Sequence, residues 1–377
     1  MVRAVLNEPP HGLWVFKDQI RSLKREPEPG EEIVVAYKGK IVGTGFYNPN
    51  SKIRIRLFSY KEEKLDLGLL RSRIAGAFRY RLGLGLGLSC RLVFAESDLL
   101  PGLIIDRYQD IFVLQTLSLG MAKRLPDVVS VLKELFSPSL IYQKDNSPLR
   151  QLEGLKNEER ILFGKVPEEL IIEQDDLRFY VDVRDGQKTG FYLDQRLNRQ
   201  EVARLSSGKR VLDLFTYTGS FALYARKGGA RSVLGVDQSK PGIELAEKNL
   251  RLNWLKCDFL RAEVFNFLRE HKESYDLIII DPPSFTRTIR DRDKAIKGYE
   301  RLFILAIEHL NPYGIIVLSS CSHYITIRDL IGVVSSGSDR KRRRFKIFKI
   351  GHQAPDHPIL PGMEETEYLR CLFLQSF

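Results

Sequence analysis

The sequence predicts an α/β protein whose C-terminal part is a doubly wound parallel sheet. Between residues 183 and 319, strand-like runs at 210–215, 232–236, 258–260, 276–280 and 314–319 alternate with helical patterns. Several of these runs are continuously apolar, which is typical of parallel strands buried on both faces. The residues before 180 lack this alternation, so other domains are expected to precede the sheet.

Three domains are predicted in the 377 residues. Residues 1–66 show short strands and turns, typical of a small β-barrel. Residues 67–180 begin with a helical pattern and continue as a mixed α+β unit. Residues 181–377 form the doubly wound domain. The segment 83–88, Gly-Leu-Gly-Leu-Gly-Leu, lacks the preceding strand and following helix of a phosphate loop, so a turn or linker is expected there.

Composition predicts a globular protein in a reducing, cytoplasmic compartment. Hydrophobic residues make up 43% of the chain, yet no run approaches the roughly 20 apolar residues of a membrane span. The N-terminus lacks the long apolar core of a signal peptide. The four cysteines are far apart and form no CxxC pair, so neither a metal site nor a disulfide framework is predicted.

A formal net charge of +11 favours a polyanionic partner, although many proteins are basic without binding nucleic acid. Lys52, Arg54 and Arg56 alternate with apolar residues and therefore share one face of a predicted strand. That face is either a solvated outer surface or a phosphate-binding surface. The run 340–344, Arg-Lys-Arg-Arg-Arg, follows a serine- and glycine-rich segment and is interpreted as an exposed loop with incidental RNA affinity.

The first two strands of the sheet predict an adenosine-containing cofactor. The first contains Asp213 and runs into a turn with Thr218 and Gly219, where a ligand can approach the backbone closely. The second ends at Asp237, a position suited to bind the ribose hydroxyls. The GxGxxG fingerprint is absent, and Asp213 would repel a pyrophosphate but attract a methionine ammonium.

Together with the Asp-Pro-Pro that ends the fourth strand, these features favour S-adenosylmethionine (SAM) over NAD. The alternative is that the two aspartates only cap turns. In the third unit, Glu263 is expected to accept a hydrogen bond from the adenine amino group, in preference to Asp258, which begins its strand.

Asp281 and Cys321 are predicted to form the reaction centre. Asp281, with two prolines after it, ends one apolar run, and Cys321 follows the next run between two serines. If both strands belong to one sheet, a carboxylate and a thiol project from neighbouring strand ends.

A thiolate that adds to carbon 6 of cytosine makes carbon 5 nucleophilic, while a carboxylate binds the N3 or N4 edge. A lone cysteine is otherwise a small buried hydrophobe, which is the interpretation of Cys90, Cys257 and Cys371.

The segment after Asp281 supplies further predictions. Enzymes that methylate exocyclic amines commonly place an aromatic residue directly after Pro-Pro, whereas here Ser284 precedes Phe285. Beyond it, Arg287, Arg290 and Arg292 could bind the phosphates that flank a flipped base. The alternative, a solvated helix start, is equally open.

The residues resemble a known family. Five segments look like those of the 23S rRNA 5-methylcytosine methyltransferases of bacteria and archaea, which carry an N-terminal PUA domain. They are Gln187 to Arg196, the turn from Asp213 to Ser220, Asp281-Pro282-Pro283, Ser320-Cys321-Ser322 and Asp356-His357-Pro358. The resemblance covers nearly the whole chain. It implies a class I methyltransferase domain, a PUA-like domain, Cys321 as nucleophile, Asp281 as its partner on the base, and Lys188 and Phe191 in the SAM site.

The resulting hypothesis is a SAM-dependent RNA cytosine-C5 methyltransferase. Its predicted partner is 23S rRNA or a large-subunit precursor particle rather than a membrane, and a homodimer is left open. One rival is an rRNA guanine N-methyltransferase, which would have no use for Cys321. Another is an RNA-binding protein with a decayed methyltransferase domain. A small-molecule methyltransferase is disfavoured because it would not need the basic N-terminal domains.

Overall fold

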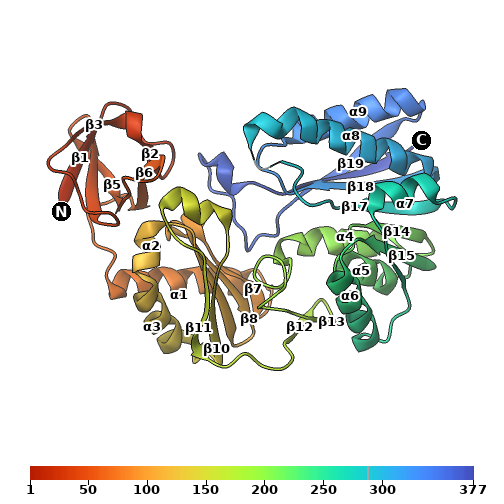
Figure 1. Ribbon diagram of the computed structural model, residues 1–377, viewed down its shortest axis with the longest axis horizontal. Coiled ribbons are helices and arrows are strands. Elements are labelled where there is room, and N and C mark those ends of the chain that lie inside the picture. The colour runs from red at the N-terminus through yellow and green to blue at the C-terminus, as the bar shows by residue number, and fades with distance from the viewer. Residues whose placement is uncertain (287) are drawn as a thin grey trace. The chain divides into compact units, whose positions relative to one another are not determined.

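Residues 1–59 of the computed structural model form a six-stranded sheet that curls around its own core (Figure 1). In the last strand, Ile55 and Leu57 are buried while Arg54 and Arg56 lie on the other face, as their alternation predicts. The sheet order is β2-β6-β5-β4-β1-β3. The strands are β1 (Val2–Leu6), β2 (Trp14–Phe16), β3 (Ile20–Leu23), β4 (Glu32–Tyr37), β5 (Lys40–Tyr47) and β6 (Ile53–Ser59).

The central region is a five-stranded sheet with helices packed on it. Asp66 accepts a hydrogen bond from the Leu69 amide and starts helix α1 (Leu67–Gly83), which ends at the glycine-rich segment. The other helices are α2 (Leu119–Lys123) and α3 (Leu125–Phe136). The order is β11-β10-β9-β8-β7. The strands are β7 (Ser89–Phe94), β8 (Leu103–Tyr108), β9 (Ile111–Thr116), β10 (Leu140–Asp145) and β11 (Glu158–Gly164).

The C-terminal part contains the predicted doubly wound sheet. Its order is β16-β15-β14-β17-β18-β20-β19, and the first five of these strands are parallel. Strand β20 pairs antiparallel with both neighbours, an addition that the sequence pattern did not predict. The strands are β14 (Arg210–Leu214), β15 (Ser232–Asp237), β16 (Asp258–Arg261), β17 (Tyr275–Ile280), β18 (Leu310–Ser320), β19 (Phe345–His352) and β20 (Arg370–Ser376).

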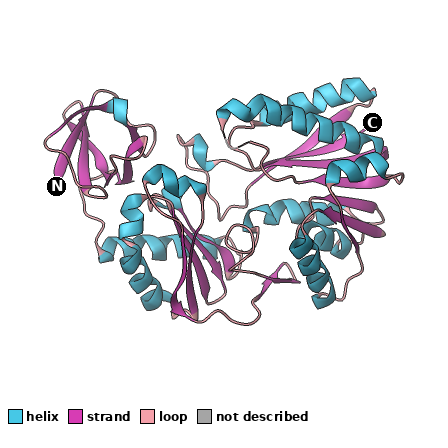
Figure 2. Cartoon of the chain, in the orientation of Figure 1, coloured by secondary structure: helices cyan, strands magenta, loops and turns pink. Residues whose placement is uncertain are grey.

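Helices cover both faces of this sheet, which explains why its strands are continuously apolar. Helices α7, α8 and α9 lie over one face, and α4 and α5 lie over the other (Figures 1 and 2). Alternate residues such as Ile278 and Ile280 pack with the first group, while Leu277 and Ile279 pack with the second. The helices are α4 (Arg196–Leu205), α5 (Ser220–Lys227), α6 (Lys240–Leu252), α7 (Val264–Glu270), α8 (Arg292–Glu308) and α9 (Ile327–Lys341). A hairpin of β12 (Ile171–Gln174) and β13 (Leu177–Tyr180) precedes them.

The basic run at 340–344 is only in part the exposed loop that the sequence suggested, because Arg340 and Lys341 belong to helix α9 and only residues 342–344 follow it as a turn. Residues 327–341 form helix α9, and Gly337 lies where an added Cβ would stand 2.6 Å from the Phe303 ring of α8. The small residues therefore allow two helices to pack closely instead of forming a flexible segment. The cations at its end are paired, as Arg340 with Glu300 and Arg344 with Asp339 show.

Two compact units share the chain. The first comprises 1–172, 181–193 and 355–366, and the second comprises 173–180, 194–354 and 367–377. The predicted domain boundaries at 66 and 180 stay predictions. The structure describes Met1–Thr286 and Thr288–Phe377. Within these residues, no helix combines the length and apolar character that a membrane span requires.

Candidate active site

Asp213, near the end of β14, carries a buried carboxylate that is only half satisfied. Its Oδ2 accepts hydrogen bonds from the Thr216 hydroxyl and from the Ala222 amide, the latter at 3.0 Å. Its Oδ1 is buried and has no hydrogen-bond partner among the described residues. Burial, assisted by the charges of Asp281 and Asp237, raises the pKa of Asp213 to about 7. A cationic amine placed at Oδ1 would satisfy this atom, as the predicted methionine ammonium requires.

The turn after β14 has the backbone of a ligand-binding loop. Phe215, Tyr217 and Gly219 adopt φ values of +63°, +47° and +77°. An added Cβ at Gly219 would stand 2.9 Å from the ring of Phe259, so both conformation and space require glycine. Thr218 is buried, and its carbonyl accepts a hydrogen bond from Asn249 at 3.0 Å. The predicted cofactor turn is thus held rigidly from helix α6.

The two other predicted acids lie at the same edge of the sheet. Asp237 ends β15, and its oxygens accept hydrogen bonds from the amides of Tyr217 at 2.9 Å and Ser239 at 2.8 Å. Glu263 caps helix α7 by accepting from the amides of Phe265 and Asn266. Its capping role gives Glu263 a structural function that the sequence reasoning had not considered, and its contact with adenine stays a prediction.

Asp281 and Cys321 follow neighbouring parallel strands. Ile280 of β17 pairs with Leu318 of β18, so Asp281 continues level with Ser319, and Cys321 lies two residues further on. Strand geometry separates the two Cα atoms by roughly 8 Å. Both side chains are partly exposed. A carboxylate and a thiol thus stand at one edge of the sheet, as expected for strands that run parallel.

Tyr299 of α8 is a fully buried side chain that the sequence reasoning missed. Its hydroxyl donates to Ser320 Oγ at 3.0 Å, and the Ser322 amide donates to the same oxygen at 3.3 Å. Burial raises the pKa of the Tyr299 phenol, and the charges of Cys321 and Asp281 raise it further. The pKa of Tyr299 therefore depends on both predicted catalytic groups, and its hydrogen bond to Ser320 supports the turn that carries the thiol. No sequence pattern distinguishes it from other apolar positions of α8.

The other three cysteines carry thiols whose pKa values are raised. Cys90 and Cys371 are buried. Desolvation raises the pKa of these two thiols and of Cys257 to about 12. Cys371 lies opposite Ser319, whose hydroxyl is 3.3 Å from its sulfur. These thiols are held protonated and inert, which supports their interpretation as structural residues.

Phe285 packs inside the second unit. Its ring lies 4.8 Å from that of Tyr299 and 6.5 Å from that of Phe265, centroid to centroid. Ser284 is exposed, and its hydroxyl donates to the Thr286 carbonyl at 2.6 Å. Phe285 is therefore partly buried against the core, which disfavours a role in stacking on a base.

Lys188 and Phe191 belong to the first unit, so their predicted contact with the cofactor stays a prediction. The ammonium of Lys188 lies 4.3 Å from the ring centroid of Tyr192, and Phe191 is buried. Their loop is anchored within that unit, where Thr189 donates to Asp106 and Lys144 donates to the Gly186 carbonyl at 2.6 Å.

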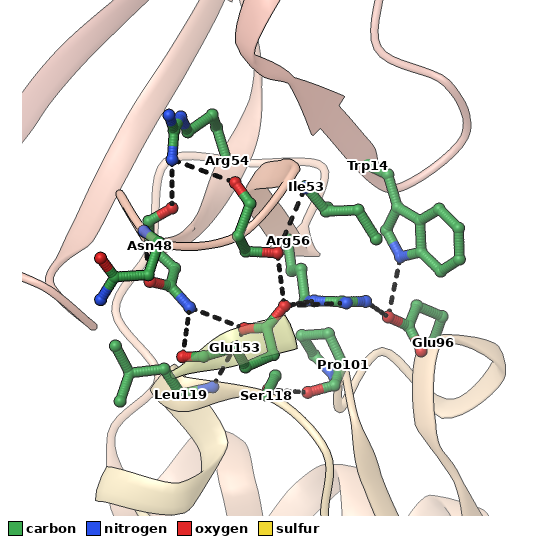
Figure 3. Close-up of polar contacts among 12 residues, drawn as sticks. Trp14, Asn48, Ile53, Arg54, Arg56, Glu96, Pro101, Ser118, Leu119 and Glu153 are labelled. Carbon is green, nitrogen blue, oxygen red and sulfur yellow. Dashed lines mark hydrogen bonds and ion pairs between the residues drawn. The ribbon is translucent and has the colours of Figure 1, made fainter. Parts of the chain in front are cut away.

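Arg56 does not face RNA, which corrects its prediction. Its guanidinium lies between two buried carboxylates, 2.9 Å from Glu96 and 3.1 Å from Glu153, and the side chain is 15% exposed (Figure 3). Trp14 donates to the same Glu96 oxygen at 2.8 Å. Glu153 also accepts from Asn48 at 2.9 Å. The charge pattern was read correctly as one strand face, but at Arg56 that face meets the central region instead of solvent.

Lys52 and Arg54 keep a place on the surface. Together with Phe16 and Lys17 they line a groove of about 570 Å³. Arg54 is fixed there, because its guanidinium donates to the carbonyls of Pro49 and of Ser51, the latter at 3.0 Å. This groove is the part of the predicted basic face that could still meet a phosphate.

The basic residues after Phe285 divide into three cases. Arg290 is exposed and makes no ion pair within the described residues. Arg292 pairs with Asp329 at 2.5 Å and so joins the starts of α8 and α9. Arg287 lies outside the described residues. Among the residues that are described, no group of three or more His, Cys, Asp or Glu side chains could hold a metal ion.

Comparisons with known proteins identify the family of the chain. Residues 157–329 match a model described as S-adenosylmethionine-dependent methyltransferase, and residues 11–60 match a PUA-like domain. A ribosomal RNA large subunit methyltransferase I from Tolumonas auensis is 39% identical over 376 residues, covering 96% of this chain and 95% of that protein. The protein of the same name from Aeromonas salmonicida is 36% identical over 375 residues, with the same coverage of both.

A solved structure confirms the fold. A Streptococcus mutans protein ascribed to the SAM-dependent methyltransferases matches with a TM-score of 0.84 and 22% identity, covering 100% of both chains. The sheet order, the half-satisfied Asp213 and the glycine turn fit SAM as cofactor. From its similarity to the two relatives over nearly its whole length, the chain belongs to the ribosomal RNA large subunit methyltransferase I family of SAM-dependent methyltransferases.

Proposed function

We propose that this protein methylates carbon 5 of a cytosine in large-subunit (23S) rRNA, with Cys321 as a covalent nucleophile. The observation that carries the proposal is the arrangement of Asp281 and Cys321 at the ends of adjacent parallel strands. The packed position of Phe285 supports a ring-carbon target over an exocyclic amine. The relatives' names support ribosomal RNA of the large subunit as the substrate, either free or in a precursor particle.

The chemistry follows from the two side chains. The Cys321 thiolate forms a bond to carbon 6 of cytosine, and the electrons of the C5–C6 double bond make carbon 5 nucleophilic. Asp281 binds the N3 or N4 edge and favours the protonated ring as the thiolate adds. SAM supplies an electrophilic methyl group. Carbon 5 then carries both a methyl group and a proton, and loss of that proton restores the double bond as the C6–S bond breaks.

The cofactor would be held by this chain's carboxylates. Asp213 is placed to bind a cationic amine through Oδ1, and Asp237 to bind the ribose hydroxyls. Lys188, Phe191, Thr218, Gly219 and Glu263 complete the predicted cofactor set. Lys52, Arg54 and Arg290 are the basic residues that we assign to the RNA, because none of them is ion-paired within the described residues.

Trapping with 5-fluorocytidine tests the nucleophile. A fluorine at carbon 5 cannot leave as a cation, so rRNA carrying it should form an adduct that survives denaturing electrophoresis, and Cys321→Ala should form none. Cys371→Ala is the matched control, since this neighbouring thiol is buried and held protonated.

An enzyme that methylates ordinary rRNA but gives no adduct would contradict the thiol mechanism. Mass spectrometry of the product nucleosides separates 5-methylcytidine from the rival methylguanosine.

A further inference from the structure

The carboxylate of Asp281 is held from the start of helix α4. Gln195 Nε2 donates to Asp281 Oδ1 at 2.9 Å. Asn198 Nδ2 in turn donates to Gln195 Oε1 at 2.7 Å and to the His352 carbonyl at 3.3 Å. The result is a chain of two side-chain amides that leads from strand β19 to the predicted reaction centre.

The direction of this chain is fixed by chemistry. An ionised carboxylate only accepts hydrogen bonds, so the amide nitrogen of Gln195 must face Asp281 and its oxygen must face Asn198. Gln195 is 3% exposed and Asn198 is 2% exposed. Buried amides in a continuous hydrogen-bonded chain have few alternative orientations, and a reversed Gln195 would point oxygen at oxygen.

The surroundings of the chain are equally specific. An added Cβ at Gly351 would stand 2.1 Å from Asn198 Oδ1, so glycine at that point of β19 makes room for the amide. Arg199, the next residue of α4, is fully buried and interacts electrostatically with Asp281. Two consecutive residues of one helical turn thus serve the same carboxylate, one through an amide chain and one through charge.

We propose that Gln195 is a positioning residue for methyl transfer, which fixes the rotation of the Asp281 carboxylate and maintains it as a hydrogen-bond acceptor for the pyrimidine edge. The inference rests on the proposed function of Asp281. It assigns a task to the start of α4, which otherwise only covers the sheet. A hydrogen bond on Oδ1 removes the freedom of the carboxylate to turn away while the Cys321 bond forms, which is the effect that preorganised groups have on a reaction.

Two substitutions at residue 195 test the proposal. Gln195→Met keeps the length of the side chain but removes the donor, and kcat should fall by about 10- to 100-fold while the affinity for SAM, measured by calorimetry, changes by less than about twofold. Gln195→Glu places a second carboxyl group against Asp281, so the pair shares a proton. The acid limb of the kcat/KM profile for rRNA should then move up by more than about one pH unit.

The matched control is Gln200→Met on the same helix, whose amide bonds Asp175 instead of Asp281 and which should keep the parent profile. Thermal unfolding and SAM affinity verify that each variant is folded. If Asp281→Asn retains full methylation, both the proposed role of Asp281 and the positioning role of Gln195 are overturned. If Asp281→Asn is inactive while both Gln195 variants behave like Gln200→Met, only the positioning role is overturned.

Discussion

Replacing Asp213 with asparagine should weaken SAM binding and at the same time stabilise the ligand-free protein. In the wild-type chain this carboxylate is completely buried, one oxygen lacks a hydrogen-bond partner among the described residues, and its pKa is about 7. The aspartate thus carries an unfavourable charge that only a cationic ligand group would neutralise. Asparagine has the same shape but no charge.

The expected pH dependence of binding follows from this pKa. Only the ionised carboxylate attracts the ammonium, and its fraction rises about ninefold between pH 5 and pH 6 for a group with pKa about 7. The dissociation constant of SAM should therefore fall by about the same factor over that interval. In Asp213→Asn the dependence should vanish, and binding at pH 7.5 should weaken by about 10- to 100-fold, as for loss of a hydrogen bond to a charged group.

The stability change has the opposite sign. Because the folded pKa lies above that of an unfolded aspartate, the folded state binds the proton more tightly, and stability falls as pH rises from about 4 to 7. Above pH 7, ionisation of Asp213 lowers the free energy of unfolding by its full amount, about 4 kcal/mol. The new amide leaves a buried N–H unsatisfied at about 1 to 3 kcal/mol, so Asp213→Asn should gain roughly 1 to 3 kcal/mol at pH 8.

Asp276 provides the matched control at the other end of the sheet. Burial acts to raise its pKa, but hydrogen bonds from the Arg210 amide and from Asn311 outweigh burial and lower it. Its contribution to stability is therefore present above about pH 4, and Asp276→Asn should destabilise at pH 8 by about 1 to 2 kcal/mol. Urea unfolding at pH 8 measures both. An Asp213→Asn variant that is less stable than the parent, or that binds SAM as tightly, would refute the reasoning.

Two further substitutions test the fold around the sites. Arg56→Ala leaves two buried carboxylates without a cation and should lower the free energy of unfolding in urea by about 3 to 5 kcal/mol. Arg71→Ala breaks an exposed ion pair and should lower it by less than about 1 kcal/mol. Equal losses would contradict a buried ion-pair network around Arg56. Gly219→Ala should abolish SAM binding in calorimetry, because its φ is positive and the methyl group would meet Phe259. Gly208→Ala, at a position of similar φ and open space before β14, should retain binding and controls for a strained glycine outside the cofactor turn.

The residues proposed to bind the cofactor could be picked out from sequence because their signals are local. A strand, a turn and a carboxylate follow one another within a few residues, so Asp213, Gly219 and Asp237 are recognisable before folding. The support of Asp281 was not predictable in the same way. Gln195 lies 86 residues earlier in the chain, and no periodicity links a glutamine at a helix start to an aspartate at a strand end.

Charge patterns were the least reliable guide, because sequence shows the sign of a side chain but not what lies opposite it. Arg56 has the same alternation as Lys52, yet only the tertiary structure brings Glu96 and Glu153 to it from 40 and 97 residues away. The basic run after the serine- and glycine-rich segment predicted a loop from residue 340, whereas Gly337 packs against Phe303 in helix α9, which extends to Lys341.

The sequence by itself determined the parallel sheet, the cofactor class, and the pairing of a carboxylate with a thiol at neighbouring strand ends, since short-range periodicity and strand order encode all three. Which of the predicted basic residues are ion-paired, and which amide holds Asp281, were decided only by the tertiary structure. Those are properties of contacts between distant segments, and a side chain's hydrogen-bond partner and burial exist only once the chain has folded.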